Sequence, residues 1–465
     1  MTKPNCSASR RAFLRRVSTL SIAGAAAPWA LSLSAMADAS AASAGDYKAI
    51  VCVFLYGGND YANTLVPYDA AGYAAYQGLR QSIAIERALL EATALKSTDV
   101  PRDTAGFTHQ YALAPGAARM LPLFDGGKMG VLLNVGTLVQ PTSKLEYANK
   151  TARLPPKLFS HNDQQSIWQS SVAEGATSGW GGRLGDVFES TNEKSTFTCI
   201  NVSNNAVFLS GRSAVQYQVT PNGSVAVAGL KNSLFGSSTA SAALRTLMTQ
   251  ARGHLLENEY NRVARRAIEA DATLSQALAG TPVPATPFPG SNSLADQLKL
   301  VARMIAAAPK LGAKRQVFMV SLGGFDTHDS LLTTHPQLLD RLGGALSAFY
   351  DATVELGVAN QVTAFTASEF GRTLTGNTNG SDHGWGSMHF VVGGAVRGQH
   401  YYGTAPVIAS NGPDDVGQGR LIPTTSVEQV AATLGSWFGL SDGELLGILP
   451  NLANFNASVR KLGFV

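Results

Sequence analysis

Five continuous runs of mostly apolar residues recur along the chain, and each ends at a glycine or a polar residue. Short apolar runs that end in this way are typical of strands buried on both faces, as at the centre of a mainly parallel sheet. The runs are Tyr47–Tyr56, Lys128–Val135, Arg315–Leu322, Gln361–Ala367 and Met388–Val392. We therefore expect them to be the central strands of the fold.

Longer segments between these runs repeat their apolar residues every three or four positions, which is the spacing of an amphipathic helix. They are Ser241 to about Leu278, Ser293–Ala308 and Pro336–Leu356. Alternating strands and helices predict an α/β fold with a doubly wound, mainly parallel central sheet flanked by helices. The four prolines within Ala279–Ser293 predict a linker or surface loop, so we interpret the region of about 240–292 as a helical insertion.

The positive charge of the chain belongs to its first 37 residues. The formal net charge is +4, yet the remaining 31 basic and 32 acidic residues give a net charge of −1. A chain with this balance does not present the basic surface that nucleic-acid binding needs. The basic residues of the first segment are Lys3, Arg10, Arg11, Arg15 and Arg16.

The same N-terminal segment is similar to an export signal. Paired arginines in Ser9–Leu14 precede an uncharged, apolar stretch that ends in the small-x-small sequence AMA at Ala37. This order resembles a twin-arginine signal. A membrane anchor is the alternative, but the stretch is weakly hydrophobic and Pro28 interrupts it. We expect residues 1–37 to engage the twin-arginine export machinery and to be cleaved. Residues 38–465 would then be a single periplasmic or secreted domain with no stable membrane span.

Two cysteines lie outside the predicted signal, each in an apolar run. Cys52 and Cys199 could pair in an oxidising compartment, or they could stay as buried free thiols. Both interpretations are open on the sequence alone. No CxxC spacing occurs, so the sequence predicts no cysteine-based metal site.

Chemically active side chains gather after several of the predicted strands. In an open α/β sheet, ligands bind beyond the carboxyl ends of the strands, so loops that follow neighbouring parallel strands converge there. The motifs are GGND at Gly57–Asp60, GGFDTH at Gly323–His328, SEFGRT at Ser368–Thr373 and, in a further loop, SDHGWGSMH at Ser381–His389.

These motifs supply a mixture of carboxylates and imidazoles. Such a mixture fits one or two divalent ions, zinc or manganese foremost, better than calcium, which prefers oxygen ligands alone. Two ions could clamp and polarise a small anionic ester. Each residue taken alone is a weak signal, because an aspartate after a strand is commonly a helix cap or turn former. The candidate ligands are Asp60, Asp326, His328, Glu369, Asp382, His383 and His389.

The order of these motifs resembles an uncharacterised bacterial family that is exported by the twin-arginine route. The resemblance runs from about Lys48 to the C-terminus and includes FSHNDQQ at Phe159–Gln165 and SGWGGR at Ser178–Arg183. That family is placed in the alkaline-phosphatase-like superfamily, with sulfatases, phosphopentomutases and cofactor-independent phosphoglycerate mutases. The resemblance implies an alkaline-phosphatase-like fold, two metal ions and an exported, metal-dependent hydrolase of phosphate or sulfate esters.

The resemblance implies roles for Ser160 and for the metal ligands, and the chemistry of His161 and Arg372 makes these two residues further candidates. Ser160 is similar to the superfamily's nucleophile, which metal coordination activates, although it could equally cap the helix that follows. His161 could donate a proton to a leaving group. Arg372 could hold an anionic substrate in a forked contact, or it could pair with Glu369 or another nearby carboxylate. The aspartates and histidines of the strand-end motifs are similar to the metal ligands.

Three spacings depart from the superfamily's pattern. Asp326 and His328 lie two residues apart and not four, and Glu369 holds the strand-end place that an Asp-His pair usually has. Asp382 follows thirteen residues later, and the last histidine of the superfamily usually lies much further downstream than His389. The metal set could therefore be rearranged, reduced to one ion or lost. The alternative function is then a non-catalytic cell-envelope protein that binds a ligand or assists assembly.

Overall fold

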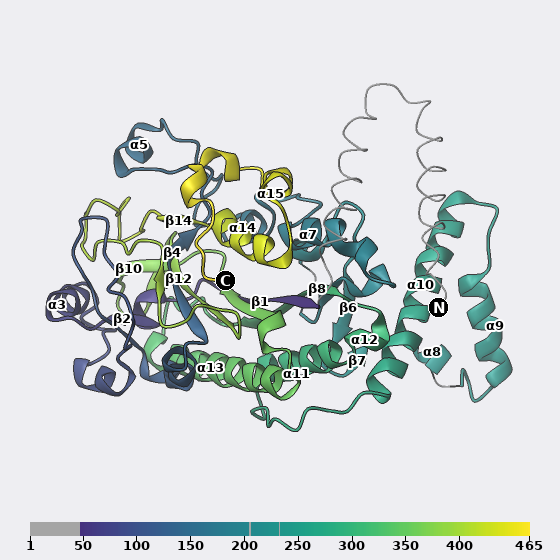
Figure 1. Ribbon diagram of the computed structural model, residues 1–465. Coiled ribbons are helices and arrows are strands. Elements are labelled where there is room, and N and C mark those ends of the chain that lie inside the picture. Colours follow the sequence, from purple (N-terminus) through teal and green to yellow (C-terminus); the bar gives the residue numbers. More distant parts are fainter. Residues whose placement is uncertain (1–46, 204–205, 232) are drawn as a thin grey trace, which may run out of the picture.

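The computed structural model describes residues 47–203, 206–231 and 233–465 of the chain (Figure 1). The predicted export signal, residues 1–37, lies outside the described residues. Every helix in the described ranges is too short or too polar to cross a membrane.

A ten-stranded sheet forms the centre of the molecule, and it is mainly parallel, as the apolar runs predict. Its path is β13-β4-β12-β9-β1-β8-β5-β6-β7, and β14 pairs with β4. The exceptions to parallel pairing are β12, which is antiparallel to both β4 and β9, and the terminal β6–β7 pair. The strands are β1 Lys48–Tyr56, β4 Met129–Gly136, β5 Cys199–Asn201, β6 Tyr217–Thr220, β7 Gly223–Ser224, β8 Arg315–Gly323, β9 Val362–Ala367, β12 Ser387–Gly393, β13 Tyr401–Tyr402 and β14 Thr425–Ser426.

Two small antiparallel ribbons stand apart from this sheet. One joins β2 to β3, and the other joins β10 to β11 at the end where β8 and β9 finish. Their bounds are β2 Leu65–Pro67, β3 Tyr111–Leu113, β10 Arg372–Gly376 and β11 Ser381–His383. The β10–β11 ribbon carries three of the candidate site residues.

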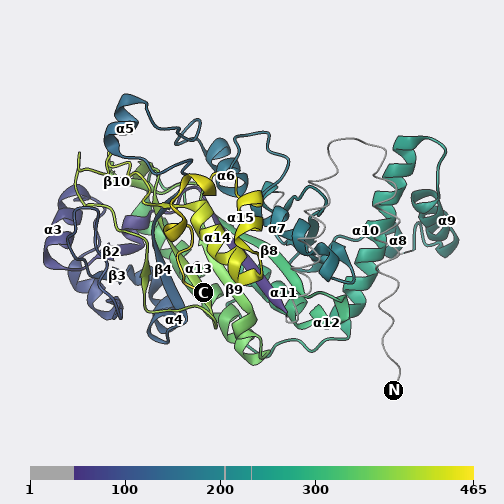
Figure 2. The same cartoon turned by 45° about the horizontal axis from the view of Figure 1, so that its top comes forward.

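Helices cover both faces of the central sheet (Figures 1 and 2). The face with α11 and α13 packs into one hydrophobic cluster, and the face with α7, α14 and α15 packs into another. The α-helices are α3 Ala70–Leu79, α4 Leu121–Asp125, α5 Lys144–Asn149, α6 His161–Ser170, α7 Trp180–Phe188, α8 Ala228–Lys231, α9 Ser238–Thr249, α10 Leu255–Ala279, α11 Ser293–Ala306, α12 Ala308–Leu311, α13 Leu331–Glu355, α14 Val427–Phe438 and α15 Asp442–Ile448.

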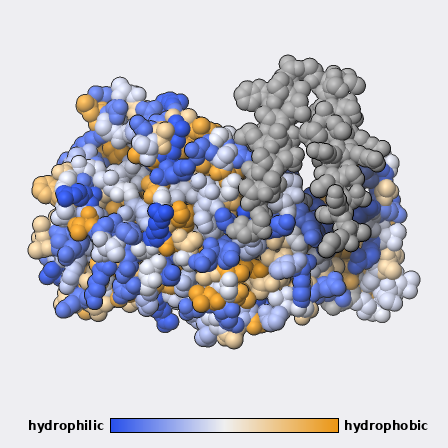
Figure 3. All heavy atoms as spheres, in the orientation of Figure 1, coloured by the Kyte–Doolittle hydropathy of each residue, from blue (hydrophilic) through white to orange (hydrophobic). Residues whose placement is uncertain are grey.

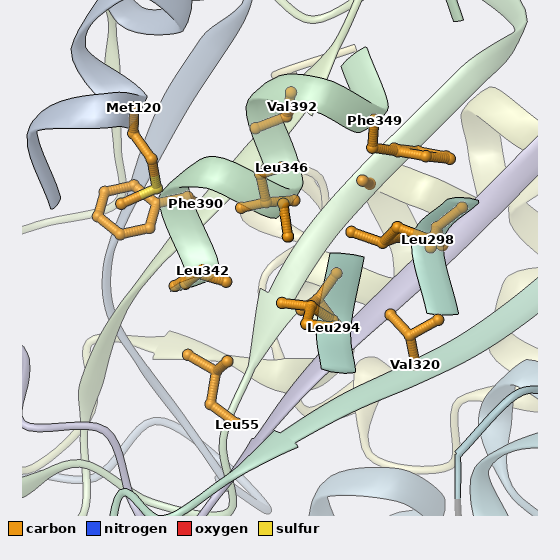
Figure 4. Packing of buried hydrophobic residues seen from close by; sticks show 14 of the residues in the cluster. Leu55, Met120, Leu294, Leu298, Val320, Leu342, Leu346, Phe349, Phe390 and Val392 are labelled. Carbon is orange, nitrogen blue, oxygen red and sulfur yellow. The ribbon is translucent and has the colours of Figure 1, made fainter. Parts of the chain in front are cut away.

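Strand β1 is apolar from Ala49 to Leu55 because both of its sides are buried. Alternate residues of a strand face opposite sides of a sheet, and both sides of β1 are covered. Val51 and Val53 belong to the cluster beneath α11 and α13, whereas Cys52 and Phe54 belong to the cluster on the other face. Figure 4 shows part of the first cluster, where side chains of α11 and α13 lie over Leu55 of β1 and Val320 of β8. The helix residues are Leu294, Leu298, Leu342, Leu346 and Phe349.

The helices differ in detail from their predicted bounds. The predicted helix from Ser241 to about Leu278 is two helices, α9 and α10, with a break at residues 250–254 that contains Gly253. Helix α13 begins at Leu331, five residues before Pro336, so this proline lies inside the helix, where it cannot donate to the carbonyl of Leu332. Helices α8, α9 and α10 lie together at one end of the molecule, beyond β6 and β7 (Figure 1).

Both cysteines of the described ranges are buried free thiols. Cys52 lies on β1 opposite Met319 of β8, and Cys199 lies on β5 opposite Val317 of the same strand. Because β8 runs between them, the two cysteines are separated by two strand spacings, roughly 10 Å. A disulfide requires Cα atoms within about 7 Å, so the fold selects the free-thiol interpretation.

The molecular surface gives little guidance to function. On the face shown in Figure 3, hydrophilic residues are interspersed with smaller hydrophobic areas. Hydropathy on this face does not single out a functional site. The chemistry instead gathers at the carboxyl ends of the central strands.

Candidate metal centre

Three histidine side chains converge on the carboxylate of Asp326, just beyond the end of β8. His328 Nε2 lies 3.1 Å and His383 Nε2 lies 3.2 Å from Asp326 Oδ1. His161 Nε2 lies 3.4 Å from Asp326 Oδ2. The ligand atoms of His161, Asp326 and His383 all lie within 4.8 Å of one another, which is the spacing of groups that can hold one metal ion.

The second nitrogen of each ring is held by an acceptor. His161 Nδ1 lies 2.9 Å from Glu369 Oε1, His328 Nδ1 lies 2.9 Å from Asp382 Oδ1, and His383 Nδ1 lies 2.8 Å from the carbonyl oxygen of Phe159. A carboxylate or a carbonyl can only accept, so each Nδ1 donates its hydrogen. In a neutral ring Nε2 then carries the lone pair that can bind a metal. Metal-binding histidines usually donate the hydrogen of their other ring nitrogen to a carboxylate or a carbonyl, as Nδ1 does here.

The closest approach in the cluster tests whether it suits a cation. His328 Nε2 and His383 Nε2 lie 2.9 Å apart. If both rings are neutral with hydrogen on Nδ1, the two Nε2 lone pairs face each other with no hydrogen between them. A cation that both nitrogens can bind would remove this repulsion. The donor set of three imidazoles and one carboxylate therefore fits a transition-metal ion.

Glycines at the end of β1 allow the loops to meet. The backbone nitrogen of Asp326 would lie only 2.3 Å from a Cβ placed on Gly57, whose φ of +118° also favours glycine. The amide of Gly57 donates to Glu369 Oε1 at 2.9 Å. The GGND motif thus brings the loops after β1, β8 and β9 into contact, as the strand-end argument predicts.

Glu369 and Asp382 lie behind the histidines and hold them in place. Glu369 is buried, and its Oε1 accepts hydrogen bonds from Gly57 N, His161 Nδ1 and Gln165 Nε2. The hydrogen bond between Glu369 and His161 raises the pKa of His161. Asp382 Oδ1 accepts from His328 and, at 3.3 Å, from Asn377 Nδ2. Both carboxylates therefore act in this structure as supports for imidazole rings.

Arg372 is fully buried and pairs with the carboxylate at the centre of the cluster. Its Nη1 lies 2.5 Å from Asp326 Oδ1 and 3.0 Å from the carbonyl oxygen of Gly57. Its Nη2 donates to the carbonyl of Ser381. Burial alone would raise the pKa of Asp326, but the hydrogen bond and charge of Arg372, with His161, hold it below its usual value. Of the two alternatives for Arg372, the structure shows pairing with a nearby carboxylate.

Asp60 stands at the end of β1, but its oxygens are taken by other partners. Its Oδ2 lies 2.5 Å from Arg80 Nη2 and 2.5 Å from Ser381 Oγ, and its Oδ1 accepts from Asn63 N at 3.0 Å. Burial works to raise the pKa of Asp60, and the Arg80 charge and these bonds lower it overall. The structure does not bring Asp60 to the three histidines. Through Ser381, Asp60 instead links the β10–β11 ribbon to the end of β1.

His389 lies on β12 within the sheet and not in the loop cluster. Its Nδ1 is 3.4 Å from Thr366 Oγ1, and within the described ranges its Nε2 has no hydrogen-bond partner. Full burial lowers the pKa of His389 to about 3, so the ring is neutral. The structure does not bring this histidine together with Asp326.

Ser160 directly precedes the ligand candidate His161, at the N-cap of α6. Its hydroxyl makes no capping bond and instead donates to Asp163 Oδ2 at 3.0 Å. Lys157 Nζ lies 3.4 Å from the same oxygen. The side chain therefore does not satisfy the helix amides, and its hydroxyl is held by a carboxylate beside the metal centre.

Comparison with known proteins adds a family to this geometry. Residues 47–448 match the model of a family described as protein of unknown function (DUF1501). The chain belongs to the DUF1501 family. No curated protein matches the sequence.

Three solved structures show how distant the similarity of this DUF1501 chain to characterised proteins is. Ps i-CgsB in complex with k-i-k-neocarrahexaose is 11% identical with a TM-score of 0.35, over 88% of this chain and 77% of the other. The lipoteichoic acid synthase LtaP from Listeria monocytogenes is 9% identical with a TM-score of 0.33, over 88% and 79%. A mutant of the alkaline phosphatase PafA is 10% identical with a TM-score of 0.25, over 70% and 64%. At these values the likenesses assign no site or activity to the DUF1501 chain.

Sequence reasoning missed part of the centre. His161 was expected to act as a proton donor, yet its Nε2 points to Asp326 among the candidate ligands. Its segment follows no strand, so the strand-end argument could not place it, and its one signal was the FSHNDQQ motif. Phe159 was missed as well, because the sequence cannot show which backbone carbonyl accepts from His383.

Proposed function

We propose that the DUF1501 chain is an exported metal-dependent hydrolase of phosphate or sulfate esters. One observation carries the proposal: three imidazole rings direct Nε2 at one carboxylate while an acceptor holds each Nδ1. The proposed ligands are His161, Asp326, His328 and His383. Phosphate and sulfate esters follow from the resemblance of the strand-end motifs to the alkaline-phosphatase-like superfamily.

The donor set favours one zinc or manganese ion. Imidazole with carboxylate suits these metals, whereas calcium takes oxygen ligands. Asp60 pairs with Arg80 and His389 lies in the sheet, so the proposal needs one ion and not two. When bound, a divalent ion supplies a Lewis acid that polarises the ester and stabilises developing negative charge.

The chain's own residues provide the nucleophile and its orientation. Ser160 is fixed between Phe159, whose carbonyl holds His383, and His161, whose Nε2 faces Asp326. The Ser160 oxygen attacks the phosphorus or sulfur atom, and Asp163, which already accepts its hydroxyl hydrogen, takes the proton. The bond between the ester oxygen and the phosphorus or sulfur atom breaks, and that oxygen leaves as the alcohol with a proton from solvent. Water then hydrolyses the Ser160 ester, which frees the anion and restores the Ser160 hydroxyl. Arg372 keeps Asp326 ionised and oriented throughout.

The location of the activity follows from the N-terminal sequence. The paired arginines, apolar stretch and AMA sequence support export by the twin-arginine machinery to the periplasm or beyond. Mass spectrometry of the exported protein would give its N-terminus. A mature chain that starts just after Ala37 supports this part of the proposal, and retention of the first 37 residues contradicts it.

The decisive experiment is metal analysis of residues 38–465, purified without chelator after native export. We expect about one zinc or manganese ion per chain in the wild type, and none in the Asp326→Ala/His328→Ala double variant. Asp99→Ala/His400→Ala is a matched control, since these residues form a surface Asp–His pair with Nδ1 and Oδ1 3.6 Å apart. A folded wild-type protein that takes up no metal on titration would refute the proposal.

A second test addresses the nucleophile. Ser160→Ala should keep the metal and lose the hydrolysis of aryl phosphates or aryl sulfates, because only the attacking oxygen is removed. Asn162→Ala, two residues after Ser160, is the control and should keep both the metal and the hydrolytic activity. An unchanged rate in Ser160→Ala would exclude Ser160 as the nucleophile.

The Asp60–Arg80 pair favours one other candidate function. The resemblance implies two ions, and a chain whose strand-end aspartate is neutralised by arginine lacks a ligand for the second. A non-catalytic envelope protein that keeps the fold would show this loss. Metal uptake without hydrolysis of any ester on a broad panel, with full complementation of a deletion strain by Ser160→Ala, would support this candidate.

A further inference from the structure

Arg420 lies beside the metal centre in a fixed position. Its Nε donates to the carbonyl oxygen of His383 at 3.0 Å, and its guanidinium carbon lies 4.6 Å from the centroid of the Phe159 ring. The carbonyl of Phe159 in turn accepts from His383 Nδ1 at 2.8 Å. Arg420, Phe159 and His383 therefore form one closed unit. The arginine contacts the ring of Phe159 and the backbone carbonyl of His383, which is a proposed metal ligand.

Among the residues that the structure describes, the charge of Arg420 has no counterpart. Across the described residues no carboxylate forms an ion pair with it, and the hydrogen bond from its side chain uses Nε alone. The other cations near the centre are paired: Arg372 with Asp326, and Lys157 with Asp163. Arg420 is only half-buried, and its Nη1 and Nη2 groups make no hydrogen bond to the described residues.

The carboxylates of the candidate metal centre already have other partners. Asp326 is held by Arg372 and three histidines, Asp382 by His328 and Asn377, and Glu369 by three donors. A half-buried guanidinium with no internal counter-charge is free to form a forked contact with the oxygens of an anion. The aromatic contact and the Nε bond orient the planar group in advance, so binding costs little side-chain entropy.

We infer that Arg420 is the residue that binds the oxyanion of the substrate, a phosphate or sulfate group, beside the metal ligands. This inference rests on the proposed function, because the anion is the group that the centre would hydrolyse. It replaces the forked substrate contact expected of Arg372, which is fully buried and already bonded to Asp326 and two carbonyls. Arg420 would then determine that the substrate is an anionic ester and not a neutral one.

The test is calorimetric titration of residues 38–465 with inorganic phosphate and with sulfate, in metal-loaded and metal-free protein. The variants are Arg420→Gln and Arg420→Lys. Arg87→Gln is the matched control, since Arg87 also lies 4.6 Å from an aromatic centroid, that of Tyr68, and its Nε donates to the Tyr68 carbonyl at 3.2 Å. Metal content is measured on every sample, and circular dichroism checks folding.

We expect Arg420→Gln to weaken binding of the preferred anion roughly 10- to 100-fold with metal content unchanged, as for loss of a charge-assisted hydrogen bond. Arg420→Lys should fall between, because it keeps the charge and loses the planar fork. Arg87→Gln should bind like the wild type. Equal affinity in Arg420→Gln and wild type would overturn the inference, as would metal-loaded wild type that binds neither anion.

Two further outcomes separate this inference from the proposed function. Loss of metal together with the anion in both Arg420 variants would show that Arg420 only positions His383, and this overturns the inference alone. Wild type that takes up no metal refutes the proposed function. If such metal-free protein still binds phosphate through Arg420, the anion site stands as a binding site without the hydrolase.

Discussion

Replacing Asp60 by alanine should damage the fold and leave the metal centre able to bind its ion. Asp60 and Arg80 are both completely buried, and their charged atoms lie 2.5 Å apart. In Asp60→Ala the guanidinium would keep only the carbonyl oxygens of Thr373 and Leu374, at 2.9 and 3.1 Å, as partners. A buried charge left without its counter-charge typically costs about 3–5 kcal/mol.

The size of this effect can be measured in two ways. Urea denaturation should lower the free energy of unfolding by about 3–5 kcal/mol, provided that the transition is a single cooperative step. For roughly 400 ordered residues, an unfolding entropy near 2.1 cal/mol/K per residue converts this loss into a fall in Tm of about 4–6 °C. Metal content per folded chain should stay at the wild-type value.

The double variant Asp60→Ala/Arg80→Met supplies the control. Removing both charges leaves no uncompensated ion, so most of the lost stability should return. Asp60→Ala with wild-type stability and no metal would refute this reasoning, because it would make Asp60 a ligand, as the superfamily resemblance implies.

Three other predictions follow from the same contacts. Glu369→Gln should weaken metal affinity about 10- to 100-fold in competition titrations, because a neutral amide orients His161 less firmly; unchanged affinity would contradict this. His389 has a folded-state pKa of about 3 against an ordinary value near 6.5, so the unfolded chain takes up a proton in this window and the folded chain does not. Stability is therefore lost as the pH falls below about 6.5, and His389→Leu should remove roughly 2.5 kcal/mol of that loss between pH 7 and 4.5 in denaturation curves, a gain that a solvent-exposed histidine would not give. Cys52 and Cys199 should both react with a thiol reagent after denaturation without reductant, and neither in the native protein; a disulfide-linked peptide in a non-reducing digest would show otherwise.

The central sheet was predictable because burial on both faces leaves a direct record in the sequence. The run at Arg315–Leu322 places apolar residues on both sides of a strand, and the structure has β8 there with one further residue. The direction of β12 was not predictable, since an apolar run is the same whether the strand pairs in parallel or antiparallel. The β10–β11 ribbon reverses the chain before β12, and its course depends on tertiary contacts such as Arg372 with Asp326.

The candidate site was predictable where its residues follow strands. Asp326 and His328 were located in this way, and the structure places Oδ1 and Nε2 of the two side chains 3.1 Å apart, whereas their role as metal ligands stays a prediction. The position of Asp60 was also correct, but a strand-end aspartate is the same in sequence whether its partner is a metal or an arginine twenty residues away. His161 reaches the centre from a helix start with no strand before it, and that arrangement exists only in three dimensions.

The proposed ligands come from three distant parts of the chain. His383 and Asp326 are 57 residues apart, and His161 is 208 residues from Glu369, which holds its ring. An ion between them would therefore act as a non-covalent cross-link that closes two long loops at once, and the unfolded chain would have almost no affinity for it. Removing the ion with a chelator should speed hydrogen exchange first in segments 157–165 and 377–384, while the amides of β1 and β8 stay protected. Metal binding would then hold together the loops at the carboxyl ends of the central strands, and it would require that all three parts of the chain have already folded.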